Sequence, residues 1–279
     1  MIIDCHVHTN PAALSKEELI NELDMAGIEK IVLMSRHPAS FSGKTGEEGD
    51  IFGKAVSPAA ALAQVMEWAA FSNRLIPFFW IDPLEEDALD QVDKAIDAGI
   101  AGFKVISNRH FPADEKPMLV WEHIAKANKP ILFHSGISWG NGAWSQYNRP
   151  VGFEPLFEIP KLRFALAHVS WPWCDECLAV YGNWQNRKDR GVTSAEMFID
   201  TTPGTPPIYR NEVFYKMYSI GYDIEDNIIF GTDCTSKYDS NNAKEILAMD
   251  KKALDHAGAS PEQREKYFGK NFLRFLNGA

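Results

Sequence analysis

The sequence predicts an α/β protein that folds as a single (β/α)8 TIM barrel over residues 1–279. Three observations indicate this fold class. Eight short apolar segments are each followed by a helical segment or by a loop with a helix, and repeated βα units predict a parallel sheet. A length of 279 residues is normal for such a barrel. Polar residues end five of the apolar segments, and in a closed barrel these ends meet at one mouth, which favours the barrel over an open doubly wound sheet.

The first half of the chain alternates as a barrel requires, and its helices have recognisable ends. Ser15 is a plausible N-cap that forms a capping box with Glu18, and Gly27 ends that helix. Pro58 is well placed in the first turn of the next helix. We expect strands at 1–9, 30–35, 75–81 and 102–107, helices at 15–27, 58–72, 86–98 and 118–127, and a long loop at 36–57 with Gly43, Gly46, Gly49 and Gly53.

The second half continues the alternation with four more strands. We expect these strands at 130–136, 163–169, 195–202 and 227–233, and helices at 154–159, 173–183, 207–219, 241–256 and 261–276. A second long loop, residues 137–152, separates the fifth strand from its helix, and loops of this length in compact domains are usually functional or mobile. No repeat, low-complexity tract or linker divides the chain, so we expect one domain.

Composition argues against several classes of function. The formal net charge of −10 disfavours a general binder of nucleic acid or of membrane surfaces, because both partners are anionic. No apolar run approaches the roughly 18 residues that span a bilayer. The first expected strand starts at Met1, so we expect no signal peptide and a cytoplasmic protein. A small molecule remains the expected partner, and the sequence leaves homo-oligomerisation open.

The first strand carries two histidines in a pattern that suits a metal ion. Strand alternation is expected to place Asp4, His6 and His8 on one face, and Cys5 and Val7 on the other. Two imidazoles that project from one face can bind a single ion, and imidazole is the commonest metal-ligating side chain. The alternative is that both histidines are ordinary polar residues at the end of a strand.

Polar residues at the ends of later strands strengthen the metal hypothesis. They are Lys104, His134, His168 and Asp233. Each residue alone is weak evidence, but histidines together with one carboxylate form a competent site for Zn²⁺ or a similar ion. Such an ion would lower the pKa of bound water to about 7. Asp233 could orient that water and take its proton, and His168 could act as a base, an acid or a hydrogen-bond donor to an oxyanion.

These segments resemble the amidohydrolase superfamily. Residues 3–8 resemble its opening D-x-H-x-H motif. The segments 101–104, 132–136, 165–168 and 230–233, with the closing segment 267–276, resemble its amidohydrolase 2 branch of metal-dependent TIM barrels. That branch contains decarboxylases similar to aminocarboxymuconate-semialdehyde decarboxylase, other nonoxidative decarboxylases and lactone hydrolases. The resemblance spans the whole chain.

The resemblance implies a role for each of five residues. His6, His8 and His134 would be metal ligands, and Asp233 would be the last ligand or a group shared between metal and water. His168 would be a catalytic or substrate-binding histidine, not a ligand, as in members with one metal. The expected cofactor is Zn²⁺, or another divalent ion such as Mn²⁺, with one ion per chain.

The position of Lys104 also allows a site with two metal ions. Other branches of the superfamily bridge two metals through a carboxylated lysine on the fourth strand, although a Gly-Phe-Lys sequence also occurs in members with one metal. Two neighbouring families fit less well. Histidinol-phosphatase-like phosphoesterases usually close with Asp-x-His, whereas Cys234 and Thr235 follow Asp233. TatD-like nucleases have a glutamate near the end of the fourth strand, where this chain has lysine.

The sequence therefore predicts an enzyme, a metal-dependent hydrolase that uses activated water to cleave a lactone, ester or amide bond of a small molecule. A nonoxidative decarboxylase of a small carboxylic acid on the same site is the alternative, because one fold and one site can host both reactions. The non-enzymatic alternative is a barrel that keeps its metal as a structural or sensing element.

Two further features have competing interpretations. Cys174 and Cys177 resemble a Cys-x-x-Cys redox motif, but we expect both to pack within the sixth barrel helix. Four tryptophans follow the fifth and sixth strands, where they could form the wall of a pocket for a planar substrate or simply pack the loops. They are Trp139, Trp144, Trp171 and Trp173.

Overall fold

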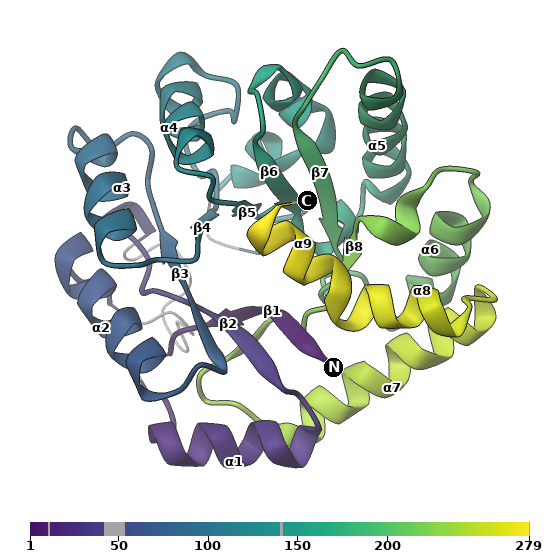
Figure 1. Ribbon diagram of the computed structural model, residues 1–279, viewed down its shortest axis with the longest axis horizontal. Coiled ribbons are helices and arrows are strands. Elements are labelled where there is room, and N and C mark those ends of the chain that lie inside the picture. Colours follow the sequence, from purple (N-terminus) through teal and green to yellow (C-terminus); the bar gives the residue numbers. More distant parts are fainter. Residues whose placement is uncertain (11, 42–53, 140–141, 279) are drawn as a thin grey trace.

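The computed structural model describes residues 1–10, 12–41, 54–139 and 142–278. Its strands form a ring, and helices α1 to α7 surround the ring on the outside (Figure 1). The strands are β1 (Ile3–His8), β2 (Lys30–Met34), β3 (Leu75–Trp80), β4 (Gly102–Val105), β5 (Ile131–Phe133), β6 (Arg163–Leu166), β7 (Glu196–Asp200), β8 (Ile228–Ile229) and β9 (Cys234–Thr235).

All neighbouring strands are parallel, in the order β8-β7-β6-β5-β4-β3-β2-β1-β9. The ring closes between its two ends, because the Cys5 amide donates to the Phe230 carbonyl at 3.0 Å and β9 pairs with the end of β1. This parallel, curled sheet with its outer helices confirms the predicted TIM-barrel fold class. The strand predicted at 227–233 is shorter than expected, since its ladder breaks after Ile229 and resumes at Cys234.

The helices lie close to their predicted positions. They are α1 (Lys16–Ala26), α2 (Pro58–Phe71), α3 (Ala88–Asp97), α4 (Glu115–Lys126), α5 (Cys174–Asp189), α6 (Pro207–Ser219), α7 (Ser240–His256), α8 (Pro261–Glu265) and α9 (Asn271–Asn277). The capping box of Ser15 with Glu18 is confirmed, and Gly27 adopts the left-handed conformation with φ 70°. In the described part of the chain, no helix combines the length and apolar character that crossing a membrane requires.

Two predicted segments differ from the structure in form. The helix expected at 154–159 is a 3-10 helix over Pro150–Glu158, and the single closing helix is divided into α8, a π-helical turn and α9. Only the ends of the loop expected at 36–57 are described, with a short 3-10 turn at Ala39–Phe41. Its four glycines lie at 42–53, outside the described residues.

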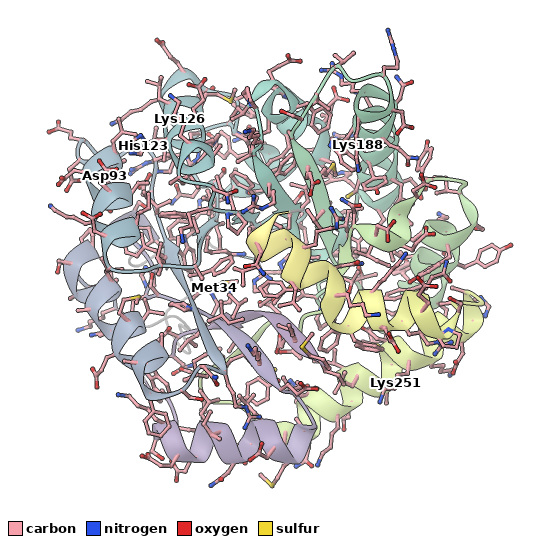
Figure 2. All side chains as sticks on the ribbon, in the orientation of Figure 1. Met34, Asp93, His123, Lys126, Lys188 and Lys251 are labelled. Atoms are coloured by element: carbon pink, nitrogen blue, oxygen red, sulfur yellow. The ribbon has the colours of Figure 1, made fainter. Side chains whose placement is uncertain are left out.

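Apolar side chains fill the inside of the ring. Met34 lies near the centre in Figure 2, whereas Asp93 and His123 lie on the outer helices α3 and α4. Phe272 and Phe275 of α9 pack with this interior cluster. Alternate strand residues face the second, larger core between the strands and the helices.

The alternation of β1 is broken. Its ladder with β2 shifts register between Asp4 and Val7. Cys5 therefore packs inside the barrel, while Val7 packs in the outer core. The prediction that Cys5 and Val7 share a face is wrong, because an irregularity in the ladder interrupts the two-residue period of a strand.

Candidate active site

A pocket of about 430 Å³ lies at the mouth of the barrel. It is lined by the candidate functional residues from the ends of the predicted strands, which are His6, His8, Lys104, His134, His168 and Asp233. Most of the remaining lining is apolar and consists of Phe41, Ile106, Ile137, Trp139, Trp144, Trp171 and Pro203. The site therefore combines a polar floor with a largely aromatic wall.

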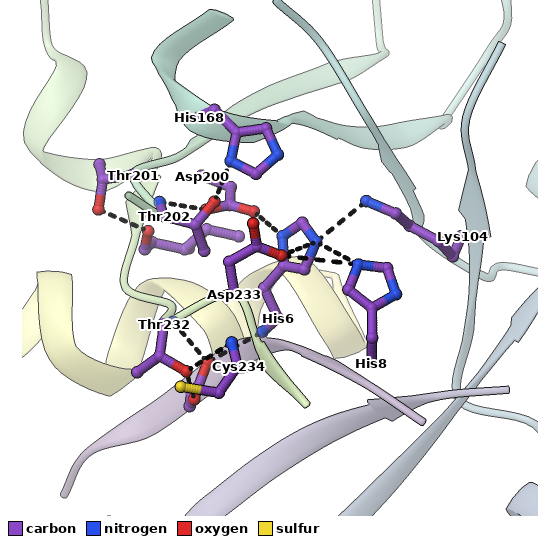
Figure 3. Close-up of polar contacts among 12 residues, drawn as sticks. His6, His8, Lys104, His168, Asp200, Thr201, Thr202, Thr232, Asp233 and Cys234 are labelled. Atoms are coloured by element: carbon purple, nitrogen blue, oxygen red, sulfur yellow. Dashed lines mark hydrogen bonds and ion pairs between the residues drawn. The ribbon is translucent and has the colours of Figure 1, made fainter. Parts of the chain in front are cut away.

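Three ligand atoms on the floor form a compact triangle (Figure 3). The Nε2 atoms of His6 and His8 are 3.1 Å apart, and the Oδ1 atom of Asp233 lies 3.4 and 3.6 Å from them. A tetrahedral ion with ligand bonds of about 2.1 Å separates its ligand atoms by about 3.4 Å. The spacing of these three atoms therefore fits a zinc-like ion.

Burial keeps the histidines in the form that binds metal. Loss of water lowers the pKa of His6, His8 and His168 well below the usual range, and it lowers the pKa of His134 to about 3. All four imidazoles are therefore neutral at pH 7, and only a neutral imidazole has a lone pair for an ion.

Asp200 fixes the orientation of His6, and the sequence interpretation missed it. Its Oδ2 atom accepts a hydrogen bond from Nδ1 of His6 at 2.6 Å. A carboxylate accepts only, so Nδ1 carries the proton and Nε2 presents its lone pair to the triangle. Asp200 is the last residue of β7, so the signal that identified the other strand ends, a polar residue after an apolar run, was available in the sequence.

Asp200→Asn is expected to weaken binding of Zn²⁺ by about 10–100-fold, the usual effect of losing the carboxylate partner of a metal-ligating histidine. The variant keeps the size of the side chain but removes the charge that holds Nδ1. Metal titration against a competing chelator measures the change, and the melting temperature of the metal-free protein controls for misfolding. An unchanged affinity would show that Asp200 does not orient a ligand.

Asp233 is aimed into the triangle by local backbone geometry. It lies between β8 and β9 with φ 56°, a left-handed conformation that turns its side chain toward the histidines of β1. The preceding residue, Thr232, is anchored because its amide and hydroxyl donate to Asp4 at 2.9 and 2.6 Å. Asp4 thus stabilises the segment that carries Asp233 and does not itself line the pocket. The surrounding protein raises the pKa of Asp233, although the Lys104 ammonium opposes this change and 37 % of the side chain stays exposed.

Lys104 is completely buried beside the triangle. Its Nζ atom lies 3.2 Å from Nε2 of His6. Burial lowers the pKa of Lys104 to about 8, while the carboxylates of Asp233 and Asp200 favour the charged form. An ion held by His6 would replace this contact with the Lys104 amine.

His134 lies in the same pocket but outside the triangle. Its ring centroid is 5.0 Å from that of His168, and its Nε2 atom is 3.2 Å from the hydroxyl of Ser138. Among the described residues, the set within reach of one ion consists of His6, His8 and Asp233. The assignment of His134 as a fourth ligand therefore stays a prediction.

His168 reaches the pocket by a route that strand alternation did not predict. β6 ends at Leu166, and His168 lies in the following turn with φ 61°. Regular alternation would group His168 with Phe164 and Leu166, which pack in the outer core. That expectation is wrong, because the left-handed turn redirects the imidazole to the mouth.

Four tryptophans were expected either to form the wall of a pocket or to pack the loops, and the structure shows both arrangements. Trp139, Trp144 and Trp171 line the pocket, whereas Trp173 lies against the guanidinium of Arg149 at 5.4 Å. The ring of Trp139 is stacked parallel to that of Trp171, with 6.3 Å between their centroids. Three of the four tryptophans thus contribute to the apolar wall.

The two cysteines at the start of α5 have the character of packing residues. Both are buried free thiols, and burial raises the pKa of Cys174 to about 11 and that of Cys177 to about 12. Neither thiol is appreciably ionised at pH 7, which disfavours redox or metal chemistry at this pair.

A double variant, Cys174→Ser with Cys177→Ser, is therefore expected to keep the metal content and turnover of the unchanged protein within about twofold, apart from a loss of stability of about 1 kcal/mol per site. Elemental analysis and kcat check this expectation. A folded double variant without metal or activity would restore the cysteine site as a hypothesis.

Comparison with known proteins decides the family. The model of a family described as Amidohydrolase (Amidohydro_2) matches residues 3–278. The chain belongs to the amidohydrolase family. No curated protein matches the chain significantly.

Solved structures of similar fold cover almost the whole amidohydrolase chain. A probable 2-pyrone-4,6-dicarboxylic acid hydrolase from Acinetobacter baumannii is 11 % identical, with a TM-score of 0.63 over 100 % of this chain and 99 % of that one. A candidate amidohydrolase from Staphylococcus aureus is 16 % identical, with a TM-score of 0.65 and 99 % coverage of both chains. Amidohydrolase 2 from Bifidobacterium longum subsp. infantis is 13 % identical, with a TM-score of 0.56 over 99 % of this chain and 98 % of that one. At these identities the likeness shows a shared fold.

Membership of the family defines the general chemistry of this amidohydrolase. It is an enzyme of the amidohydrolase superfamily and, in general terms, a metal-dependent hydrolase. The group of His6, His8 and Asp233 offers such an ion a place at the barrel mouth.

Proposed function

We propose that this amidohydrolase uses activated water to hydrolyse a lactone, ester or amide bond of a small molecule. The observation that carries the proposal is the arrangement of His6, His8 and Asp233. The histidine side chains are almost fully buried, whereas 37 % of the Asp233 side chain is exposed. The metal-binding nitrogens are thus fixed, while a carboxylate oxygen remains accessible to water and substrate.

Each candidate residue would have a distinct role in this reaction. His6, His8 and Asp233 would hold one Zn²⁺ or Mn²⁺ ion, with His134 as the expected fourth ligand. The ion would polarise the scissile carbonyl and make hydroxide available at neutral pH. Asp233 would orient the attacking water and accept its proton. The reaction also needs a second proton transfer, the one that the leaving group requires, and His168 would carry it out.

The pocket limits the substrate to a compact molecule. A volume of about 430 Å³ and a wall of aromatic side chains suit one ring or a short acyl chain with few charges. The Acinetobacter neighbour is described as a hydrolase of a pyrone, which is a cyclic ester. Lactones are therefore the first substrates to test.

Decarboxylation is the second candidate, and Lys104 is the observation that favours it. Its buried Nζ atom lies beside the metal triangle and could bind a substrate carboxylate. His168 or Asp233 would then protonate the carbon from which CO₂ leaves.

The test uses purified protein loaded with Zn²⁺ or Mn²⁺. Aromatic and alicyclic lactones, aryl esters and anilides are followed by acid release with a pH indicator, and aromatic carboxylic acids are followed by CO₂ release. Metal-dependent acid release supports hydrolysis, whereas metal-dependent CO₂ release replaces it with decarboxylation. Stable metal binding without either reaction would favour a structural or sensing ion.

A further inference from the structure

We propose that Tyr267 is a positioning residue that fixes the end of β7 and, through it, the carboxylate of Asp200. The contact runs through Thr201, the residue next to Asp200. A buried ion pair of Arg210 with Asp250 holds the tyrosine in place. The use of this arrangement in metal binding rests on the proposed function, but the position of Asp200 does not.

Thr201 connects Tyr267 to the end of the strand. It is the first residue after β7, its side chain lies apart from the histidines in Figure 3, and it is buried without lining the pocket. Its amide donates to the carbonyl of Ile229 at 3.1 Å, and its hydroxyl oxygen lies 2.6 Å from that of Tyr267. The neighbouring carboxylate of Asp200 instead accepts from Nδ1 of His6 at 2.6 Å. Contacts with the outer core and with the pocket therefore hold the same strand end.

Tyr267 is held both by its hydroxyl and by its ring. The hydroxyl donates to Oδ2 of Asp250 at 2.6 Å. A phenol has only one proton to give, so its oxygen accepts from the hydroxyl of Thr201. The ring meets that of Phe214 edge to face, with 5.7 Å between the centroids. Tyr267 also lies in the π-helical turn Lys266–Lys270, and such turns occur frequently at functional sites.

The ion pair beside Tyr267 gives fixed geometry more than stability. Arg210 of α6 and Asp250 of α7 have side chains that are 1 % and 0 % exposed. Oδ1 of Asp250 lies 2.7 Å from Nε and 2.5 Å from Nη2 of Arg210. Withdrawing two charges from water offsets most of their attraction, so a buried pair is a weak source of stability. The guanidinium nevertheless fixes one oxygen of Asp250 and leaves the other for the Tyr267 hydroxyl. Two outer helices and the π-helical turn thus define one hydroxyl position at the end of β7.

Two measurements on Tyr267→Phe test the proposal, and neither uses a substrate. The first is the proton resonance of Nδ1–H of His6 in its hydrogen bond to Asp200, recorded before Zn²⁺ is added and assigned by its absence from His6→Ala. We expect this resonance to move upfield and its proton to exchange faster with water. The second is the affinity for Zn²⁺, titrated against a competing chelator. We expect it to fall about 3–10-fold, less than for loss of the carboxylate, because Asp200 is displaced and not removed.

Tyr181→Phe is the matched control. Tyr181 is also a buried tyrosine, and its hydroxyl donates to the carbonyl of Asp223 at 3.0 Å, where neither residue lines the pocket. The control should lower the melting temperature to a similar extent and leave both readouts unchanged. Thr201→Val should reproduce the effect of Tyr267→Phe, whereas Thr201→Ser, which keeps the hydroxyl, should retain the original pattern. Combining Tyr267→Phe with Thr201→Val should add nothing to either single change, because both remove the same contact.

The proposal is overturned if Tyr267→Phe leaves either readout unchanged, or if Tyr181→Phe changes both equally. The two Thr201 variants decide the matter if Tyr267→Phe fails to fold, since they remove or keep the same contact from the side of the strand. A protein that binds no Zn²⁺ or hydrolyses no substrate would refute the proposed function alone, and the His6 resonance would still decide the role of Tyr267.

Discussion

His6→Ala is expected to abolish stoichiometric metal binding. The substitution removes the nitrogen that lies 3.1 Å from Nε2 of His8 and 3.4 Å from Oδ1 of Asp233, so only two atoms of the triangle remain. It also leaves the buried carboxylate of Asp200 without its imidazole partner. Removing the carboxylate behind a ligand costs up to about 100-fold in affinity, and removing the ligand itself should cost more. Elemental analysis after dialysis against Zn²⁺ at equal protein concentration measures the loss.

A histidine on the outer surface provides the control for this substitution. His123 of α4 pairs with Asp93 of α3 at 2.6 Å on the outer helices (Figure 2), and neither residue lines the pocket. His123→Ala should therefore keep the full metal content. Retention of one Zn²⁺ per chain in folded His6→Ala would refute the ligand assignment. His134→Ala, in parallel, is also expected to lose metal, and normal binding there would restrict the protein ligands to the triangle.

His168→Asn is expected to keep the metal and lose turnover by about 10²–10⁴-fold, the usual effect of removing a positioned acid or base. Asparagine fills part of the space and can still contact the hydroxyl of Thr202, but it cannot exchange a proton near neutral pH. The triangle of ligand atoms does not include His168, so the ion should stay in place.

Two measurements on the same preparation check this second expectation. Metal stoichiometry is determined beside kcat for the best substrate of the panel. Loss of metal in proportion to loss of rate would identify His168 as a ligand and would favour a two-metal site that involves Lys104. Full activity with full metal content would remove His168 from the chemistry.

The sequence by itself determined the barrel and the residues that meet at its mouth. Apolar segments of strand length that alternate with capped helices specify a parallel ring, and the carboxyl ends of its strands must converge. For that reason His6, His8, Lys104, His134 and Asp233 could be placed together from their strand-end positions, although up to 227 residues separate them along the chain. Asp200 is also a polar residue at the end of an apolar strand, so the same criterion could have identified it.

Only the tertiary structure decided how these side chains point. The break in the β1 ladder, the left-handed residues at His168 and Asp233, and the packing of Gly204 on His168 all depend on contacts between distant segments. A two-residue period describes an uninterrupted strand, so it gives no direction for a residue that lies past the end of the ladder. The hydrogen bonds that join Asp200, Thr202, His6 and His168 exist because the carboxyl ends of β1, β6 and β7 converge at the mouth of the barrel, and local sequence carries no information about such pairings.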